Sequence, residues 1–157
     1  MSSRAYVGLG ANLGDGAATL RQALTELAAL PGVQDCRSSP LYRSAPVDAT
    51  GPDFINAVAA LQTTLTPLGL LDALQAIEQR HDRQRPYRNA PRTLDLDLLM
   101  YDDLELQTTR LILPHPRLHE RAFVLYPLRD LAPDLRLPQG SYADLLHGLQ
   151  DQGIARL

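Results

Sequence analysis

The chain has no lysine, one cysteine, few aromatic residues and no excess of positive charge. All 15 of its basic residues are arginine, so a charged contact to phosphate must use a guanidinium group. The single Cys36 excludes an internal disulfide and suits a reducing compartment. No apolar run is long enough to cross a bilayer, and no basic segment followed by an apolar one opens the sequence. These absences predict a soluble, cytoplasmic protein.

The length and composition are those of one ordinary globular domain. The chain has 157 residues, of which 45% are hydrophobic and 21% charged, and a domain of about this size buries about 70% of its unfolded surface. The net charge of −3 argues against a general nucleic-acid-binding protein. No internal repeat, low-complexity tract or linker divides the sequence. We therefore expect a single domain over residues 1–157.

Residues 91–100, with the sequence PRTLDLDLLM, carry the clearest pattern in the chain. Alternation of polar and apolar residues predicts a half-buried strand, with Asp95 and Asp97 on one face. Leu94, Leu96 and Leu98 then point to the opposite face. Two carboxylates ~5 Å apart would repel each other by about 3 kcal/mol at an effective dielectric near 20. A divalent cation or neighbouring arginine should compensate, although a solvated strand face is the alternative.

An arginine-rich segment directly precedes this strand. It contains Arg80, Arg83, Arg85, Arg88 and Arg92, and two prolines in it discourage a helix. Guanidinium groups so close together repel one another unless an anion gathers them, although an exposed, solvated loop would also tolerate them. Arginines beside a metal-holding carboxylate pair are what transfer of a polyphosphate group requires. The two stretches together favour a phosphoryl-transfer site.

The remaining periodicity predicts strands and helices in the order βαββαβ. A glycine-rich turn over residues 10–16 leads to Asp15 as a helix N-cap, and Thr66 with Pro67 begins a second helix that runs to residue 82. The first helix has an apolar stripe of Leu20, Leu24, Leu27 and Ala28. Strands are expected over residues 5–10, 33–47, 54–65 and 93–100, a small hairpin over 104–113, and short helices around 123–131 and after Ser141.

This order predicts an α+β fold with a ferredoxin-like antiparallel sheet, helices on one face and a small C-terminal extension. Asn56 falls within a predicted strand, where a buried amide needs partners. It could read the edge of a heterocycle, or bond a neighbouring loop. Pro114 and Pro116 flank His115, which suits a positioned donor to phosphate, although a structural role is the alternative.

Four separated stretches resemble the 6-hydroxymethyl-7,8-dihydropterin pyrophosphokinases of folate biosynthesis. They are residues 8–15 (GLGANLGD), 53–56 (DFIN), 91–97 (PRTLDLD) and 114–123 (PHPRLHERAF). The resemblance covers nearly the whole chain, and the third and fourth motifs are specific. It implies a ferredoxin-like fold and transfer of pyrophosphate from ATP to the hydroxymethyl oxygen of the pterin, leaving AMP. It also implies two Mg²⁺ ions, with ATP as co-substrate.

The resemblance also implies roles for individual residues. Asp95 and Asp97 would hold the two Mg²⁺ ions, and Arg83 and Arg92 would be catalytic with them. The pterin ring would lie between Phe54 and Phe123. Asn56, with backbone groups around Ser44, Ala45 and Val47, would read the edge of the pterin, and Asp95 would also bind the pterin by orienting its attacking hydroxyl. Those implied in binding ATP are Gln75, Glu78, Arg85, Arg88, Leu98, Arg110, Leu111, Ile112, His115, Pro116 and Arg121.

Several positions depart from the family's usual pattern. Asn89 stands where a Trp is often found, Ala90 where a Gly is common, and Ile112 lacks a hydroxyl that some members offer to ATP. These changes bear on loop sealing and nucleotide affinity rather than on the class of reaction. A family member that binds ATP without turnover, or a non-catalytic binding module for RNA or a regulatory ligand, are the alternatives. We expect small-molecule partners, no nucleic acid, no membrane and a monomer.

Overall fold

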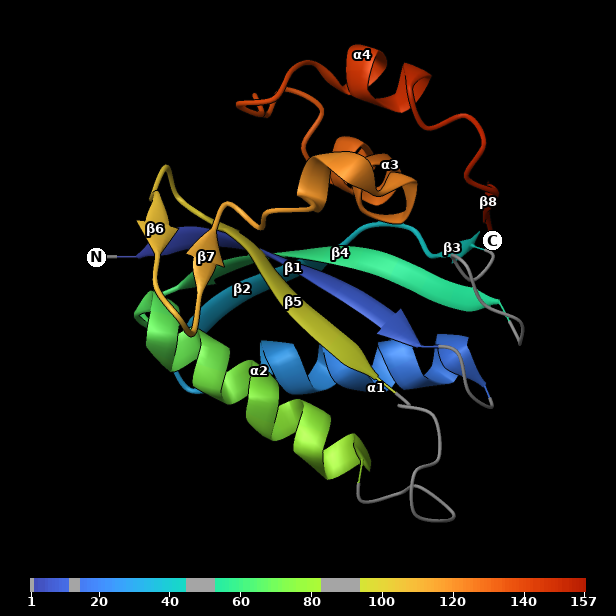
Figure 1. The fold of residues 1–157 in the computed structure, drawn as a ribbon. Coiled ribbons are helices and arrows are strands. Elements are labelled where there is room, and N and C mark those ends of the chain that lie inside the picture. Colours follow the sequence, from blue (N-terminus) through green and yellow to red (C-terminus); the bar gives the residue numbers. More distant parts are fainter. Residues whose placement is uncertain (1, 12–14, 45–52, 83–93) are drawn as a thin grey trace.

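The computed structural model describes residues 2–11, 15–44, 53–82 and 94–157. The first part of the chain forms a sheet and two helices (Figure 1). Its elements are β1 (Ser3–Ala11), α1 (Gly16–Ala28), β2 (Val33–Ser38), β3 (Tyr42–Ser44), β4 (Phe54–Thr63), α2 (Pro67–Asp82) and β5 (Asp95–Tyr101). The second part holds β6 (Leu106–Gln107), β7 (Ile112–Leu113), the 3₁₀ helix η1 (Leu118–Glu120), α3 (Ala122–Leu131), α4 (Tyr142–His147) and β8 (Ile154–Arg156).

The main sheet is antiparallel throughout the described strand pairs. Its strands follow the order β5-β1-β4-β3-β8, and β2 also pairs with β4. The extended stretch expected over residues 33–47 is therefore two strands, β2 and β3, with Pro40 between them. Proline cannot donate to a strand ladder, which accounts for the break. The expectation of an α+β fold with an antiparallel sheet is confirmed.

Side-chain caps begin three of the helices at the residues that the sequence predicts. Asp15 Oδ1 accepts a hydrogen bond from Ala18 N at 3.1 Å, and Thr66 Oγ1 accepts one from Gly69 N at 3.0 Å. At α4, Ser141 Oγ accepts from the Asp144 backbone N–H. Each cap satisfies a backbone donor that has no partner within its helix, which is typically worth ~1 kcal/mol.

Helices lie on both sides of the sheet, so the expectation of helices on one face only is wrong (Figure 1). α1 and α2 cover one face, and there Leu94, Leu96 and Leu98 are buried as predicted. In the helix α1 the buried alanine is Ala23, whereas Ala28 is exposed, which corrects the expected stripe. The reason is geometric, because Ala23 lies on the same helical face as Leu20 and Leu27.

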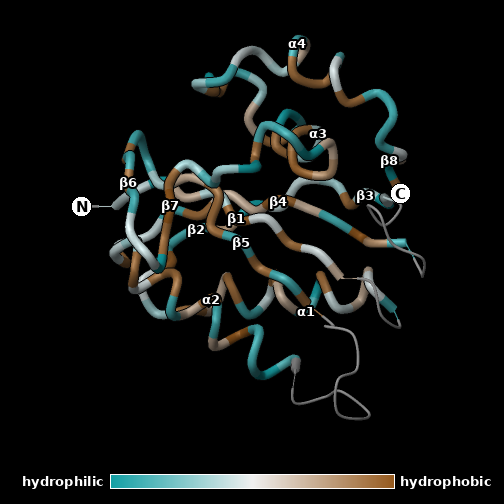
Figure 2. Tube along the Cα trace, in the orientation of Figure 1, coloured by the Kyte–Doolittle hydropathy of each residue, from teal (hydrophilic) through white to brown (hydrophobic). Residues whose placement is uncertain are grey.

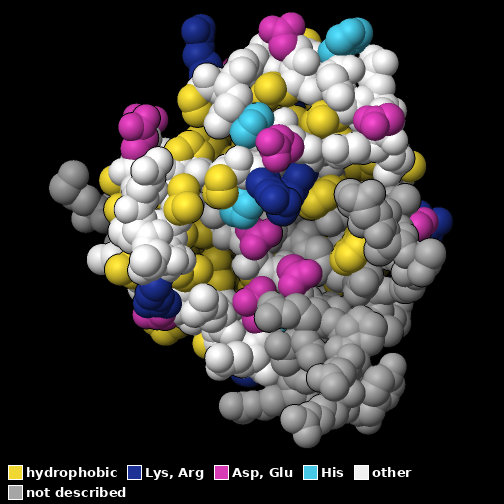
Figure 3. Space-filling model, viewed as in Figure 1, with side chains coloured by type: hydrophobic (Ala, Val, Ile, Leu, Met, Phe, Trp, Pro, Cys, Tyr) yellow, Lys and Arg dark blue, Asp and Glu magenta, His cyan; other side chains and the backbone are white. Residues whose placement is uncertain are grey.

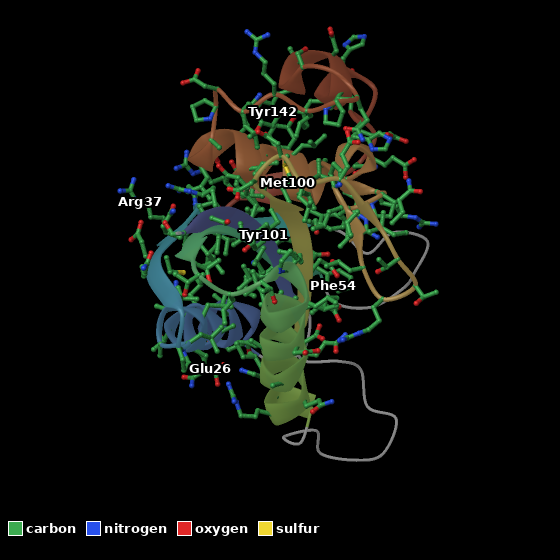
Figure 4. All side chains as sticks on the ribbon, turned by 90° about the vertical axis from the view of Figure 1, so that its left-hand side faces the viewer. Glu26, Arg37, Phe54, Met100, Tyr101 and Tyr142 are labelled. Atoms are coloured by element: carbon green, nitrogen blue, oxygen red, sulfur yellow. The ribbon has the colours of Figure 1, made fainter. Side chains whose placement is uncertain are left out.

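The C-terminal region forms a second apolar layer on the opposite face. α3 continues through Pro127 to Leu131 and buries Leu125 and Leu128 against Val58 and Leu99 of the sheet. Figure 2 shows the central strands between two sets of hydrophobic segments, and Figure 4 shows Met100 and Tyr142 on the α3 side with Glu26 on the other. None of the described helices has the length and apolar character needed to span a bilayer.

Candidate functional site

Two glycines in β1 have no side chains, so the α3 face of the sheet is uncovered between Asn56 of β4 and the two aspartates of β5. Gly10 pairs with Asn56 on one side and Asp95 on the other, and Gly8 pairs with Asp97. Directly paired residues project to the same face of a sheet. The side chains of Asn56, Asp95 and Asp97 therefore surround a patch of bare backbone at Gly8 and Gly10, which we call the floor. A Cβ atom at Gly10 would lie 3.2 Å from Asn56 Nδ2. The floor is therefore open because these two positions carry no side chain.

A cavity of about 480 Å³, which we call the sheet hollow, lies over this floor. Its walls bring together five of the residues that the family resemblance assigns to the pterin, from β3, β4, β5 and α3. They are Ser44, Phe54, Asn56, Asp95 and Phe123. Aromatic side chains from two elements and a buried amide are groups that recognise a flat, polar-edged ring.

The Asn56 amide is fixed by a bond from the neighbouring strand. Ser44 Oγ donates to Asn56 Oδ1 at 2.6 Å, and both side chains are buried. Because this bond occupies an oxygen lone pair, it fixes which way the amide faces, and the amide still lines the sheet hollow. Asn56 thus has a structural partner and a place at the cavity wall, so the two interpretations drawn from the sequence are compatible.

A second cavity of about 370 Å³, the edge hollow, lies along the outer edge of β5 between α2 and the β6–β7 hairpin. It brings together eight residues that the resemblance assigns to ATP. They are Gln75, Glu78, Leu98, Arg110, Leu111, Ile112, His115 and Pro116. Leu96 N donates to Glu78 Oε2 at 2.8 Å, so the N–H groups of alternate β5 residues, Leu98 included, face this edge.

The two hollows meet at Asp95 and Asp97, which line both. Arg121 NH1 lies 3.8 Å from Asp97 Oδ2, and the Arg121 guanidinium also lies 5.5 Å from the centre of the Phe123 ring. Arg121 lines the sheet hollow rather than the edge hollow where the ATP assignments gather. Figure 3 shows acidic, arginine and histidine side chains close together near the middle of this face.

His115 is held next to the acid pair by its own backbone and ring. Its backbone N–H donates to Leu99 O at 2.8 Å, and its ring Nδ1 accepts from Arg117 N at 3.1 Å. Burial lowers the pKa of His115, with Asp97 opposing this and the two nearby arginines adding to it. A neutral ring that accepts at Nδ1 carries its proton on Nε2, so His115 is a hydrogen-bond donor through Nε2 at neutral pH.

Arg110 lies at the edge hollow in an exposed ion pair. Arg110 NH2 is 2.5 Å from Asp72 Oδ1 and 3.4 Å from Gln75 Oε1, both on α2. The side chains are about half exposed, so the pair contributes little stability and its guanidinium can change partners at little cost. The contact joins the turn before β7 to α2 at the wall of the edge hollow.

The donor set at the junction fits magnesium. Within the part of the chain that the structure describes, no three His, Cys, Asp or Glu side chains form a cluster able to hold a metal alone. Two carboxylates are nevertheless a common protein contribution to Mg²⁺, which takes its other oxygen ligands from water and substrate phosphates. Asp95 and Asp97 therefore fit an ion that is shared with a phosphate-bearing substrate.

Some predicted residues lie outside the described residues, and some residues at the cavity walls were not predicted. Arg83, Arg85, Arg88, Arg92, Ala45 and Val47 belong to the first group. Arg117, Glu120 and Gln152 belong to the second and line the sheet hollow. Arg117 and Glu120 lie within the PHPRLHERAF motif, so the motif itself is the sequence signal for both. Gln152 carries no signal in the sequence, because its place depends on contacts with residues 30 and 32 positions away.

Known proteins resemble this chain along most of its length. A Pseudomonas aeruginosa protein named 2-amino-4-hydroxy-6-hydroxymethyldihydropteridine pyrophosphokinase is 50% identical over 159 residues, covering 100% of this chain and 98% of that protein. A Haemophilus influenzae protein of the same name is 43% identical over 155 residues, covering 98% and 97%.

Solved structures show the same fold. That of Plasmodium falciparum wild-type HPPK-DHPS with pterin and p-hydroxybenzoate has a TM-score of 0.73 at 14% identity, covering 95% of this chain. The present chain spans 43% of the length of that larger protein. Residues 6–133 match the family described as 7,8-dihydro-6-hydroxymethylpterin-pyrophosphokinase. With this match and relatives up to 50% identical, the chain belongs to the 7,8-dihydro-6-hydroxymethylpterin-pyrophosphokinase family.

Proposed function

We propose that this protein transfers pyrophosphate from ATP to the hydroxymethyl oxygen of 6-hydroxymethyl-7,8-dihydropterin, giving the pterin diphosphate and AMP in folate biosynthesis. The names of its relatives support this activity. The observation that carries it is that two separate hollows meet at one carboxylate pair, Asp95 and Asp97. A reaction between a ring and a nucleotide needs two such sites and one point of contact between them.

The sheet hollow is the proposed pterin site. Phe54 and Phe123 lie on the two sides of the ring in an offset stack, and Asn56 reads its polar edge with Ser44 behind it. Ala45 and Val47 are proposed to supply further backbone contacts to that edge. The hydroxymethyl group would then point toward Asp95, the acid that pairs with Gly10 on the floor.

The edge hollow is the proposed ATP site. The outer edge of β5 at Leu98 would bond the nucleotide base, beside Gln75, Glu78, Leu111, Ile112 and Pro116. Arg110, His115 and Arg121 would contact the phosphates, with His115 donating from Nε2. Arg85 and Arg88 are proposed as additional cationic contacts. A guanidinium can bond two phosphate oxygens at once, which suits a chain whose cationic side chains are all arginine.

Asp95 and Asp97 would hold magnesium, and two ions are proposed from the family resemblance. When bound, magnesium neutralises charge on the triphosphate and lowers the cost of bringing it to an acceptor. Arg121, 3.8 Å from Asp97, is proposed to stabilise the negative charge that develops on the transferred group, and Arg83 and Arg92 are proposed to act with it. The pterin is neutral, so the protein mainly orients it and compensates charge.

We propose a single domain over residues 1–157, a monomer, a cytoplasmic location, and neither nucleic acid nor membrane as partner. The strand order β5-β1-β4-β2, with α1 and α2 as crossovers on one face, supports the finer description of the fold as ferredoxin-like.

AMP release tests the proposed function directly. Purified protein is incubated with ATP, Mg²⁺ and 6-hydroxymethyl-7,8-dihydropterin, and with each component omitted in turn. AMP is expected only in the complete mixture, together with an equal amount of pterin diphosphate. A folded protein that binds ATP but releases no AMP would contradict the proposal, and so would AMP release that does not depend on the pterin.

A further inference from the structure

A side chain near the C-terminus holds the turn that carries Arg121 and Phe123. Gln152 Oε1 accepts a hydrogen bond from Ala122 N at 2.8 Å, and Gln152 Nε2 donates to Glu120 O at 3.0 Å. One primary amide thus bonds the backbone on both sides of Arg121. In Figure 1 the segment that holds Gln152 runs from α4 to β8, and its two hydrogen bonds place Gln152 at this turn.

The hydrogen bond from Ala122 N to Gln152 replaces the side-chain cap that α3 lacks at its own N-terminus. Ala122 is the first residue of α3, and the N-cap residue Arg121 makes no capping bond with its side chain. The first backbone N–H groups of a helix have no partner within it, so an outside acceptor is needed. Gln152 provides that acceptor, and its amide nitrogen satisfies the carbonyl at the end of η1. An amide side chain suits this place because it both accepts and donates.

The bridged turn presents two side chains to the proposed pterin site. The Arg121 guanidinium is 3.8 Å from the Asp97 carboxylate and 5.5 Å from the centre of the Phe123 ring, and both residues line the sheet hollow. Their directions depend on the backbone at residues 120–122, which is the part that Gln152 bonds. Gln152 itself lines the same cavity.

We infer that Gln152 is a positioning residue for the pterin: by bridging Glu120 and Ala122 it holds Arg121 and Phe123 in the geometry that receives the ring. This inference rests on the proposed function. Gln152 lies beyond residues 6–133, the part of the chain that matches the family description, so this support comes from the C-terminal segment.

A positioning role differs measurably from a general contribution to stability. If Gln152 only held the C-terminal segment in place, its loss would lower the melting temperature and affect ATP and pterin alike. If it positions the turn, pterin affinity falls by more than ATP affinity, because Arg121 and Phe123 both line the sheet hollow and only Arg121 is proposed to reach the phosphates.

The test compares Gln152→Met, Gln152→Glu and the control Gln150→Met. Methionine keeps the length of the side chain but neither donates nor accepts strongly, whereas glutamate keeps the acceptor for Ala122 N and loses the donor. Gln150 is exposed two residues away and its amide contacts only the exposed His147 among the bonds described. The measurements are the KM for the pterin, the Kd of a non-hydrolysable ATP analogue with Mg²⁺, and hydrogen exchange at the Ala122 amide.

We expect Gln152→Met to raise the pterin KM about five- to tenfold, as loss of two neutral hydrogen bonds at one turn allows. In Gln152→Met, hydrogen exchange at the Ala122 amide should speed up, and the Kd of the ATP analogue should stay within about twofold of the wild-type value. The pterin KM of Gln152→Glu should lie between those of Gln152→Met and the wild type. Gln150→Met should match the wild type. An unchanged pterin KM, an equal loss of both ligands, or unchanged exchange at Ala122 would overturn the inference. If the wild type releases no AMP, the proposed function fails, and exchange at Ala122 still decides whether the bridge exists.

Discussion

The sheet hollow and the edge hollow share two carboxylates but are built from different parts of the fold. Paired strands form the floor of the sheet hollow, so register fixes where Gly10, Asn56 and Asp95 stand relative to one another. The edge hollow lies instead between a strand edge, a helix and a short hairpin, with no ladder joining the three. One site is set by backbone pairing and the other by packing of separate elements.

The polar contacts in the two hollows differ in the same way. The Ser44–Asn56 bond is buried and neutral, whereas the Arg110–Asp72 pair is exposed and charged. A buried neutral bond is costly to break and therefore keeps one geometry, which suits discrimination of a ring by shape. An exposed ion pair is worth little and lets its arginine turn to an incoming phosphate. The comparison predicts that mutations on each side affect one ligand and that mutations at the junction affect the reaction itself.

Asp97→Asn should give the largest effect, because Asp97 belongs to both hollows. The substitution keeps the size of the side chain but removes the charge proposed to hold magnesium and to face Arg121. We expect turnover to fall by about a thousandfold or more, since electrostatic stabilisation of transferred phosphate is the main catalytic resource proposed here. The measurement is AMP release at saturating ATP and pterin.

Asp103→Asn is the matched control for the junction. Asp103 is exposed in the turn that follows β5 and lines neither hollow. It should retain full turnover, and circular dichroism should show both variants folded. Wild-type turnover in Asp97→Asn would remove the metal-holding role and the common point on which the comparison of the two hollows depends.

Phe123→Ala should act on the pterin alone. The ring lines the sheet hollow and lies beneath the Arg121 guanidinium. Loss of one stacking face and its buried area should cost about 2 kcal/mol, which is about 30-fold in pterin KM. Alanine is a good helix former, so α3 should persist. A comparable loss in ATP-analogue Kd would show that the two hollows are not separate recognition sites.

The sequence predicted well those parts of the site that depend on local pattern. Alternation at 93–98 places Asp95 and Asp97 on one face, and caps at Asp15, Thr66 and Ser141 start the helices. It could not indicate that α3 covers the second face of the sheet, since that depends on the apolar patch of Val58 and Leu99 brought together by strand pairing.

Contacts between distant residues were the other limit. The register that places Gly10 between Asn56 and Asp95 joins three strands, and no single window of sequence contains it. Gln152 reaches a turn 30 residues earlier through a short segment with no periodic pattern. Resemblance to a family supplied names for the residues of both hollows, but the separation into two cavities became visible only in three dimensions.

Arg110→Ala should act on the nucleotide alone. Its guanidinium exchanges an exposed ion pair with Asp72 for a phosphate, so the net loss on truncation should be modest. We expect about a tenfold higher Kd for the ATP analogue, or about 1.4 kcal/mol, with the pterin KM unchanged. Arg21→Ala, on the exposed side of α1, is the control for lost charge. An equal change in both variants would mean that Arg110 acts only through net charge.

Ser44→Ala should give the smallest of these effects, and it tests the buried hydrogen bond at the wall of the sheet hollow. It removes the hydroxyl that donates to Asn56 Oδ1, so the amide can turn and no longer presents a fixed edge. We expect about a fivefold higher pterin KM, corresponding to ~1 kcal/mol for one buried hydrogen bond, and no change in ATP-analogue Kd. Because the serine acts only through the amide, Ser44→Ala should add little in an Asn56→Ala background. Additive losses in the double variant would instead mean that Ser44 contacts the ring directly, since independent sites add within about 0.5 kcal/mol.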